Sequence, residues 1–286
     1  MNELIRSAKI TAGISYASQD FNSLNPDDCI FCLLITPEQL MYHIADLKSK
    51  KIYIIQPFRF TSKVNTDIAV NLKSIAQEDS FLQQNFNQKR ISVFNSQFTF
   101  IPSLFYNIND SELFTFNTSQ NQTLEVRSDE FQRQDFTIMY GLSPAFMQLC
   151  TEYFPGAAIN HSLTTLITEL LTISKSDETG IVYTYVQQCS LQIIYIKNET
   201  LHFCNNFSYA TPEDFVYHVL FTYKQLHLDP EKDKLILLGE IEKQSSLFHL
   251  IFKYIRFVEF GQRVTKWKYD RDYSFPDHYY FNLLCI

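Results

Sequence analysis

The same order of predicted secondary-structure elements occurs twice along this chain, and this repetition limits the folds that are open to it. Three strand-like runs in quick succession are followed by a helix, a strand and a second helix. The three runs cover residues 29–36, 40–46 and 51–58 in the first half, and 181–187, 191–196 and 201–205 in the second. The halves share almost no residues, so the repeat is one of element order.

Helix-start signals support this order. Ser143 followed by Pro144 predicts an N-cap and a first helical turn. Thr211, Pro212 and Asp214 supply a cap, a first-turn proline and an acidic residue at the positive end of a helix. Further helices are expected at about residues 66–82, at 160–174, and from Ser245 or Ser246 onward, and strands at 89–95, 97–101, 135–140, 157–159, 234–240 and 256–263.

Three meandering strands, a helix, a strand and a helix form the ribonuclease H-like unit, which is duplicated in actin-like proteins. We therefore expect an α/β protein with a duplicated ribonuclease H-like (actin-like ATPase) fold, in which each of two lobes has a mixed five-stranded sheet flanked by helices. The first lobe should cover residues 1–175 and include an inserted subdomain, and the second 176–286. The polar stretch 107–134 is expected to form loops with at most a short strand, and 175–180 is the expected hinge.

Charge and hydropathy exclude several classes of partner. The formal net charge of −7 and the scattered Lys and Arg residues argue against nucleic-acid binding. The apolar runs, such as residues 31–35 and 235–238, fall far short of the ~20 residues that a membrane helix needs. Residues 1–28 lack a signal-peptide pattern, so we expect a cytoplasmic protein without membrane insertion.

Cys29 and Cys32 form a C-x-x-C pattern that is compatible with a redox pair or half a zinc site. Both lie in one strand-like apolar run, where residues three apart point to opposite faces. The sequence has no second C-x-x-C and no His pair to complete a metal site. We expect free, metal-free strand residues.

Several short motifs resemble an uncharacterised bacterial family, domain-of-unknown-function family 3822. These motifs are Phe100-Ile-Pro-Ser-Leu-Phe105, Phe154-Pro155 with His161, Phe203-Cys-Asn-Asn-Phe-Ser-Tyr209, residues 215–228, Lys234-Leu-Ile-Leu-Leu-Gly-Glu240, Lys253-Tyr254-Ile255, and His278-Tyr-Tyr-Phe-Asn-Leu-Leu284. The resemblance covers most of the chain. It implies an actin-like ATPase fold, similar in layout to the pilus-assembly protein PilM and the division protein FtsA, and no established activity.

Active actin-like ATPases hold nucleotide with two acidic, glycine-rich hairpin turns and a Gly-Gly turn at the adenosine, because backbone N–H groups must approach the phosphates closely. The equivalent hairpins here, at residues 33–40 and 183–191, contain no glycine, and Pro37 removes a donor. Gly239, at the end of a strand, is the one remnant of the adenosine turn, although a lone glycine there is more often simple turn geometry.

Other candidate residues are weaker. Asp270, Asp272, Asp277 and His278 could suggest a metal site, but their aromatic-rich segment is expected to pack as a closing strand. His161 is expected to cap or pack a helix start. A ribonuclease H-type nuclease would need clustered acids on its first strand, and residues 29–36 contain none.

The leading hypothesis is a non-catalytic actin-like scaffold or interaction module, a pseudo-ATPase with a degenerate nucleotide site. We expect it to bind a protein partner or a second copy of itself and to need no cofactor. The side chains of Tyr183, Tyr185 and Gln187 are expected to fill the space that nucleotide occupies in active relatives. The alternative is a nucleotide-binding ATPase with an unorthodox site, in which backbone donors and Gly239 suffice. Fold alone does not decide between them.

Overall fold

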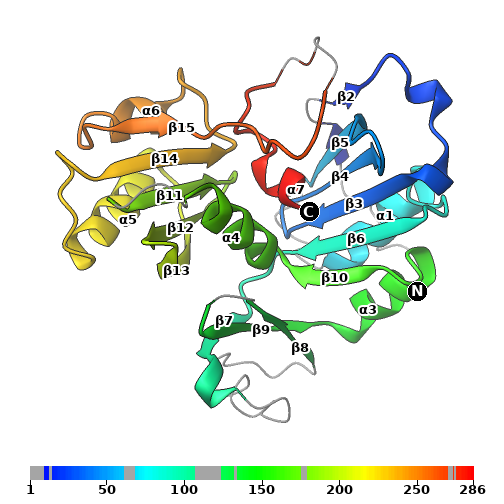
Figure 1. Cartoon of the computed structure of the whole chain (residues 1–286), viewed down its shortest axis with the longest axis horizontal. Helices are drawn as coiled ribbons and strands as arrows, with labels where there is room; N and C mark the ends of the chain where they lie inside the picture. Colours follow the sequence, from blue (N-terminus) through cyan, green and yellow to red (C-terminus); the bar gives the residue numbers. More distant parts are fainter. Residues whose placement is uncertain are drawn as a thin grey trace, which may run out of the picture. The chain divides into compact units, whose positions relative to one another are not determined.

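The computed structural model describes residues 10–12, 15–60, 68–106, 124–131, 134–174, 179–269, 273 and 275–286 (Figure 1). The chain divides into two compact units. Unit 1 comprises Met1–Thr165, Thr265–Ser274 and Ile286, and unit 2 comprises Leu166–Val264 and Phe275–Cys285. The boundary that we expect at residue 175 stays a prediction, because residues 175–178 lie outside the described part of the chain.

Unit 1 is built on a seven-stranded mixed sheet of order β1-β5-β4-β3-β6-β10, with β2 also paired to β5. Its strands are β1 (Ile10–Ala12), β2 (Tyr16–Ala17), β3 (Cys29–Ile35), β4 (Gln39–Asp46), β5 (Ile52–Phe60), β6 (Gln88–Val93) and β10 (Ala158–His161). β3, β4 and β5 are antiparallel neighbours, whereas β6 runs parallel to β3 and β10 parallel to β6. The strands β3, β4 and β5 form the expected meander, and β6 lies on the side of β3 that faces away from β4.

Two helices, α1 (Ile68–Glu78) and α3 (Pro144–Tyr153), cover one face of this sheet. Alternate residues of β3, including Phe31 and Leu33, pack against them because successive strand side chains point to opposite faces. α3 begins where its sequence predicts, since the Ser143 hydroxyl accepts a hydrogen bond from the Phe146 N–H at 3.2 Å. α4 (Ser162–Ile173) follows β10, and the short helices η1 (Phe21–Ser23) and η2 (Pro26–Asp28) precede β3.

An inserted three-stranded antiparallel sheet interrupts unit 1 between β6 and β10. Its order is β7-β9-β8, formed by β7 (Phe98–Pro102), β8 (Glu125–Glu130) and β9 (Phe136–Leu142), with η3 (Ser103–Phe105) after β7. Ile101 and Met139 form its small core. Six residues of the 107–134 stretch therefore form a regular strand, and residues 107–123 lie outside the described part.

Unit 2 has a five-stranded sheet of order β13-β12-β11-β14-β15. Its elements are β11 (Ile181–Val186), β12 (Ser190–Lys197), β13 (Thr200–Ser208), α5 (Pro212–Gln225), β14 (Lys234–Gly239), α6 (Ser246–Ile251), β15 (Val258–Phe260) and α7 (Phe281–Cys285). Thr211 and Asp214 form a complete capping box at α5, and Ser245 caps α6. α5 and α6 pack on one face of the sheet through Phe215, Val219 and Ile251.

The two units share one strand topology. β5-β4-β3-β6-β10 and β13-β12-β11-β14-β15 have the same order and the same pattern of antiparallel and parallel pairing. This confirms the duplicated ribonuclease H-like unit. In both units the first hairpin turn lies beside the carboxyl end of the fourth strand, since those strands are parallel.

Three details differ from the expectation. Unit 1 gains β1 and β2 at one edge, so its sheet has seven strands rather than five. The last regular strand, β15, covers only three of the eight expected residues. The closing segment ends in a helix, α7, rather than a strand, and all five of its residues are buried. A short helix buried on every side has no amphipathic period, so its apolar run resembles that of a buried strand.

Candidate functional site

The first hairpin turn, Thr36-Pro37-Glu38-Gln39, is the unit 1 counterpart of a phosphate-binding turn. Its backbone closes through Thr36 N–H to the Gln39 carbonyl at 2.8 Å. The Thr36 hydroxyl oxygen accepts hydrogen bonds from the N–H groups of Glu38 at 3.2 Å and Gln39 at 3.1 Å. Pro37 has no N–H. The amides that could face a phosphate here are therefore already bonded to the chain's own threonine.

The second turn, Gln187-Gln188-Cys189-Ser190, closes in the same way, with Gln187 N–H bonded to the Ser190 carbonyl at 2.9 Å. The buried Gln187 side chain accepts from the Ser190 hydroxyl at 3.2 Å and from the Gln192 amide at 3.3 Å, and the latter amide also reaches Asn206 at 2.9 Å. Within the described part of the chain, the tip amides of Gln188 and Cys189 have no such partner. The second turn is thus the less fully bonded of the two.

Gly239 ends β14 directly beside Val186, the last residue of β11. Its φ of +82° lies in the left-handed region that favours glycine. A Cβ placed here would lie 2.3 Å from the Val186 carbonyl oxygen. The Gly239 N–H donates to the His278 carbonyl at 2.9 Å. Backbone packing within unit 2 therefore accounts for this glycine.

The equivalent place in unit 1 holds an ordinary residue. Val93 pairs with Ile35 just as Gly239 pairs with Val186. The backbone bond that follows is also the same, since Phe94 N–H reaches the Ile35 carbonyl and Glu240 N–H reaches the Val186 carbonyl, both at 2.8 Å. The shared fold does not require a glycine at this register position. In unit 2 the chain turns here with φ +82° at Gly239, and the Ile241 N–H donates to the Gly239 carbonyl at 3.0 Å, so this local turn favours glycine.

Tyr183, Tyr185 and Gln187 are buried within unit 2. They alternate with Val182 and Val186, which pack on the α5 and α6 face, so these three side chains lie on the opposite face of β11. The Tyr183 hydroxyl lies 2.8 Å from the Ser174 hydroxyl, just after α4, and the Tyr185 ring lies beside Gly239. These side chains are part of the core of unit 2.

The most extensive buried polar network in the described residues centres on Asp129 of β8. Its carboxylate accepts four hydrogen bonds, from the Tyr140 hydroxyl, the Asn160 amide, the His161 N–H and the Thr164 hydroxyl, at 3.1, 3.2, 2.7 and 2.7 Å. The last two donors lie at the amino end of α4, where the helix dipole favours an anion. The network joins the inserted sheet to the start of α4.

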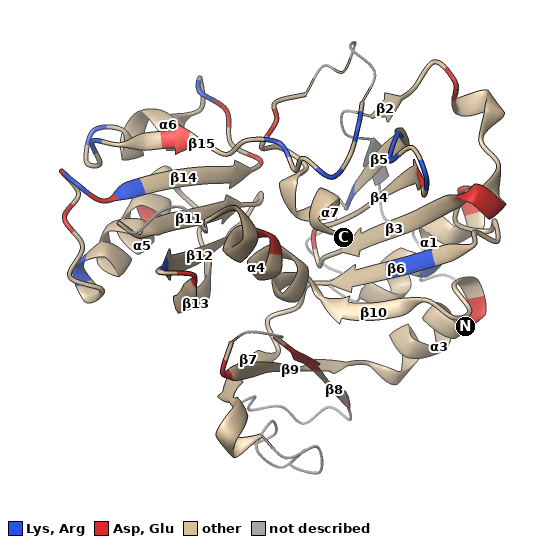
Figure 2. Ribbon diagram, in the orientation of Figure 1, with Lys and Arg blue, Asp and Glu red and all other residues tan. Residues whose placement is uncertain are grey.

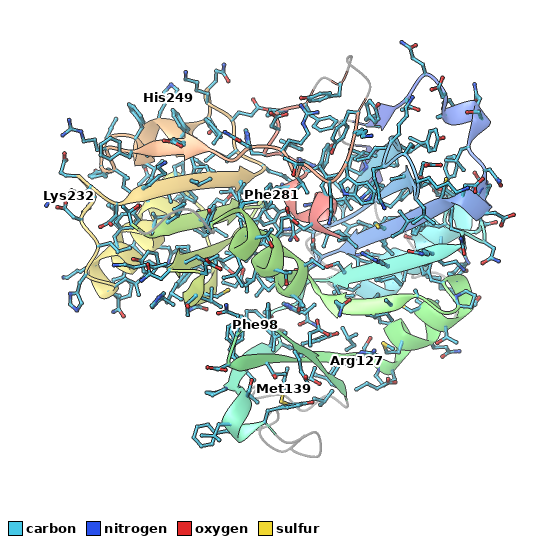
Figure 3. The ribbon with its side chains drawn as sticks, in the orientation of Figure 1. Phe98, Arg127, Met139, Lys232, His249 and Phe281 are labelled. Carbon is cyan, nitrogen blue, oxygen red and sulfur yellow. The ribbon has the colours of Figure 1, made fainter. Side chains whose placement is uncertain are left out.

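His161 adds an aromatic wall to this network. Its ring centroid lies 5.0 Å from that of Phe98, which is labelled in Figure 3, and 5.3 Å from that of Tyr140, and its Nδ1 accepts from the Leu163 N–H at 3.3 Å. Complete burial lowers its pKa from 6.5 to about 3, so the ring is neutral at physiological pH. His161 therefore packs and caps the helix start, as the sequence predicts.

The remaining candidates that the structure describes are engaged in other contacts. Asp277 pairs with Arg263 at 3.2 Å, and His278 stacks on Phe260 while its Nε2 lies 2.7 Å from the Ile241 carbonyl. Asp270 and Asp272 lie outside the described residues. Cys29 and Cys32 are buried free thiols on opposite faces of β3, and burial raises their pKa to about 11 and about 12. No group of three potential metal ligands occurs in the part of the chain that is described.

The hairpin turns, the repeated strand order and the inserted sheet define an actin-like fold, and structural comparison supports this class. A Bacteroides thetaiotaomicron protein with an actin-like ATPase fold and unknown function matches with a TM-score of 0.73 and 21% identity, over 85% of this chain and 93% of that one. A chain of the PilM-PilN type IV pilus biogenesis complex matches with a TM-score of 0.54 and 10% identity, over 90% of this chain and 96% of that one.

The sequence comparison is more specific. The model of the family described as "Protein of unknown function (DUF3822)" matches residues 18–258. The chain belongs to the DUF3822 family. A search of curated proteins gives no match. None of the described helices is long and apolar enough to cross a membrane.

Proposed function

We propose that this protein is a non-catalytic actin-like scaffold that binds a protein partner or a second copy of itself. The first hairpin turn carries the proposal. To use this turn, a phosphate would have to displace the Thr36 hydroxyl from two backbone amides, and the turn has no lysine, arginine or glycine to compensate. A triphosphate also brings several negative charges to a chain whose own net charge is −7.

The second unit supports the same proposal. The Gln187 side chain is held by Ser190 and Gln192, and the N–H of Gly239 is bonded to His278. Its positive φ and its close packing give the glycine a reason that needs no ligand, which supports the proposal. A fold inherited from nucleotide-binding ancestors can lose its phosphate turns and keep its surfaces for assembly. PilM assembles with PilN in the complex noted above, and we propose an assembly role of this general kind here.

One observation favours the alternative, a nucleotide-binding protein with an unorthodox site. The amides of Gln188 and Cys189 are without a partner among the described residues, so the second turn retains two donors. They are exposed, which lowers the energy that a hydrogen bond to phosphate would gain. Titration with nucleotide separates the two proposals.

We expect no heat of binding when ATP and magnesium are titrated calorimetrically into the protein up to millimolar concentration. Micromolar binding would contradict the scaffold proposal, and a Gln188→Pro variant would then show whether the second turn is responsible. Proline removes one of the two free donors. Pro37 already occupies the equivalent place in the first turn, so the substitution should be compatible with this turn.

A surface on unit 2 suits a protein partner. Phe252, Tyr254 and Phe257 are 55%, 51% and 46% exposed, in the segment that links α6 to β15. Residues 243–258 contain three cationic residues and no acidic one. Two of these, Lys253 and Arg256, are exposed and stand between the aromatic residues in the sequence, and the Arg256 guanidinium lies 5.6 Å from the Phe257 ring centroid. Arg256 forms an ion pair with Glu231 at 3.6 Å. Both side chains are largely exposed to solvent, so this ion pair is weak. We propose that an acidic protein segment binds here.

A photo-reactive residue placed at Tyr254 should form a discrete adduct in cells, whereas the same residue at Glu152, on the exposed side of α3, should not. Adding Lys253→Glu and Arg256→Glu should abolish the adduct, because the surface would then repel an acidic segment. An adduct that survives both charge reversals would show that the partner is not selected by acidity. Equal labelling at Tyr254 and Glu152 would contradict a specific surface.

A further inference from the structure

Lys89, on β6, is a buried cation in unit 1. The residue is only 8% exposed, and its ammonium lies 2.7 Å from the Asn85 Oδ1 and 3.4 Å from the Pro155 carbonyl oxygen. Both partners are neutral, and no carboxylate of the described residues lies within ion-pair distance of it. Burial lowers the pKa of Lys89. A buried cation without a counter-charge is unfavourable unless something else compensates it.

This ammonium lines a cavity. The cavity has a volume of about 360 Å³ and is bounded by Asp27, Asn85, Phe86, Asn87, Lys89, Pro155 and Gly156. Its walls are mainly polar, and both acceptors of Lys89 are among them. One segment of β6, the strand that contains Lys89 and Arg90, is blue in Figure 2, and Asp27 is the one acidic residue that lines the cavity. The volume falls within the range of small-molecule sites, roughly 300–1,000 Å³.

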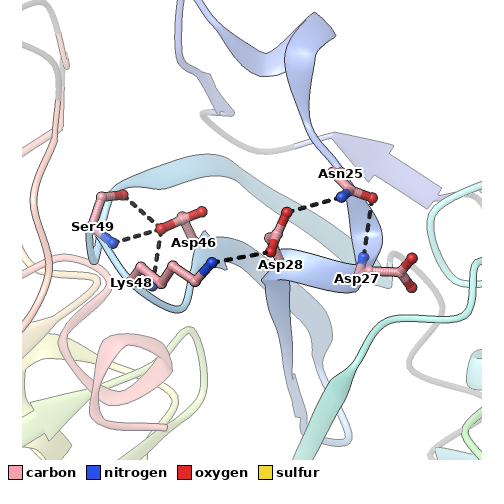
Figure 4. A network of polar contacts seen from close by, with 6 residues as sticks. All are labelled: Asn25, Asp27, Asp28, Asp46, Lys48 and Ser49. Carbon is pink, nitrogen blue, oxygen red and sulfur yellow. Dashed lines mark hydrogen bonds and ion pairs between the residues drawn. The ribbon is translucent and has the colours of Figure 1, made fainter.

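Asp27 supplies the opposite charge at the rim of the cavity. Figure 4 shows the neighbouring polar contacts. The Asp28 carboxylate accepts a hydrogen bond from the Asn25 amide at 2.9 Å and lies 3.8 Å from the Lys48 ammonium, and the Asp46 carboxylate accepts one from the Ser49 hydroxyl. Asp27 joins this network only through its backbone N–H, which donates to the Asn25 side chain. Within the described residues the Asp27 carboxylate has no cationic partner, and it is beyond ion-pair distance of Lys89. The cavity therefore has one cation and one anion that do not neutralise one another.

We propose that this cavity binds a small zwitterion of the α-amino-acid class, with its carboxylate at Lys89 and its ammonium toward Asp27. A zwitterion supplies both missing counter-charges and adds no net charge to an acidic protein. The amides of Asn85 and Asn87 can donate to its carboxylate. Dianions such as phosphate match less well, because Asp27 repels them, and simple amines leave Lys89 unpaired. The cavity lies beside the amino end of β6, whereas the first hairpin turn, residues 36–39, lies at the opposite end of this sheet.

The test is calorimetric titration of the full chain with each of the common L-amino acids, with acetate, methylamine and inorganic phosphate as single-charge and dianion probes. At least one amino acid should bind, and Lys89→Met should weaken it more than tenfold. Asp27→Asn should also weaken it, several-fold, because the ammonium loses its counter-charge. Lys48→Met, which removes an exposed lysine on the same unit, should change nothing.

The direction in which Asp27→Asn changes the binding affinity distinguishes a zwitterion from an anion. If phosphate or acetate binds in preference to amino acids, and Asp27→Asn strengthens that binding, the site is an anion site and the zwitterion proposal is wrong. If no probe binds to the wild-type chain, Lys89 only ties β6 to the turn after α3, and the proposal fails. Circular dichroism and fluorescence of the single Trp267 confirm that each variant is folded.

Discussion

Replacing Gly239 by alanine should lower the free energy of unfolding of unit 2 by roughly 3–4 kcal/mol, the sum of a left-handed backbone penalty and a steric one. The backbone at Gly239 has φ +82°, which L-residues adopt at a cost of about 1–2 kcal/mol. A methyl group would also lie 2.3 Å from the Val186 carbonyl oxygen, which is backbone in the centre of the sheet. That carbonyl accepts the Glu240 N–H, so displacing it disturbs the β11–β14 pairing. Hydrogen exchange of the β11 and β14 amides measures the loss.

Gly156→Ala is the matched control. Gly156 has φ +76°, close to that of Gly239, but a Cβ there would meet no atom within 4 Å. It should cost only the backbone penalty, about 1–2 kcal/mol, measured by urea unfolding with Trp267 fluorescence as the probe in unit 1. If Gly239→Ala costs no more than this control, packing against Val186 does not explain the glycine, and a role in ligand binding becomes the better account.

Signals confined to a few neighbouring residues could be predicted from the sequence. The caps Ser143, Thr211 and Ser245 each accept a hydrogen bond from the amide three residues further on, so the local sequence alone identifies them. The repeated strand order could also be predicted from the sequence, because the apolar runs of β3 and β11 are each followed by turn residues and a further strand-like run.

What could not be predicted depends on residues far apart in the sequence. The partners of Asp129 lie 11, 31, 32 and 35 residues along the chain, so nothing in its own polar stretch distinguishes it from a loop aspartate. The environment of Lys89 could not be predicted for the same reason, since one of its two acceptors, the Pro155 carbonyl, is 66 residues away. The hydroxyl of Thr36 is the intermediate case. Its bonds are local, yet a threonine before Pro37 can equally point to solvent, and only the turn geometry directs it to the amides.

The second large effect is expected at Asp129. Asp129→Ala should lower the free energy of unfolding of unit 1 by roughly 3–4 kcal/mol, because four donors lose a hydrogen bond to the buried carboxylate and a buried donor that finds no other acceptor costs about 1–3 kcal/mol. The Tyr140 hydroxyl keeps a 3.4 Å contact to the Ile159 carbonyl, which limits the total. The loss should be largest at the amino end of α4, where the His161 N–H and the Thr164 hydroxyl each lose a 2.7 Å hydrogen bond. Urea unfolding followed by Trp267 fluorescence gives the total, and hydrogen exchange at His161 gives the local part.

Glu130 offers a matched control on the same strand. It is the next residue of β8, and its side chain is exposed where that of Asp129 is buried, so Glu130→Ala should change stability by less than about 0.5 kcal/mol. Asp129→Asn should fall between the two alanine variants, because it keeps one acceptor oxygen and turns an amide group toward a donor. Equal losses for Asp129→Ala and Glu130→Ala would mean that water replaces the carboxylate without cost. In that case the inserted sheet is attached to the start of α4 by the packing of His161 against Phe98 and Tyr140, rather than by this network.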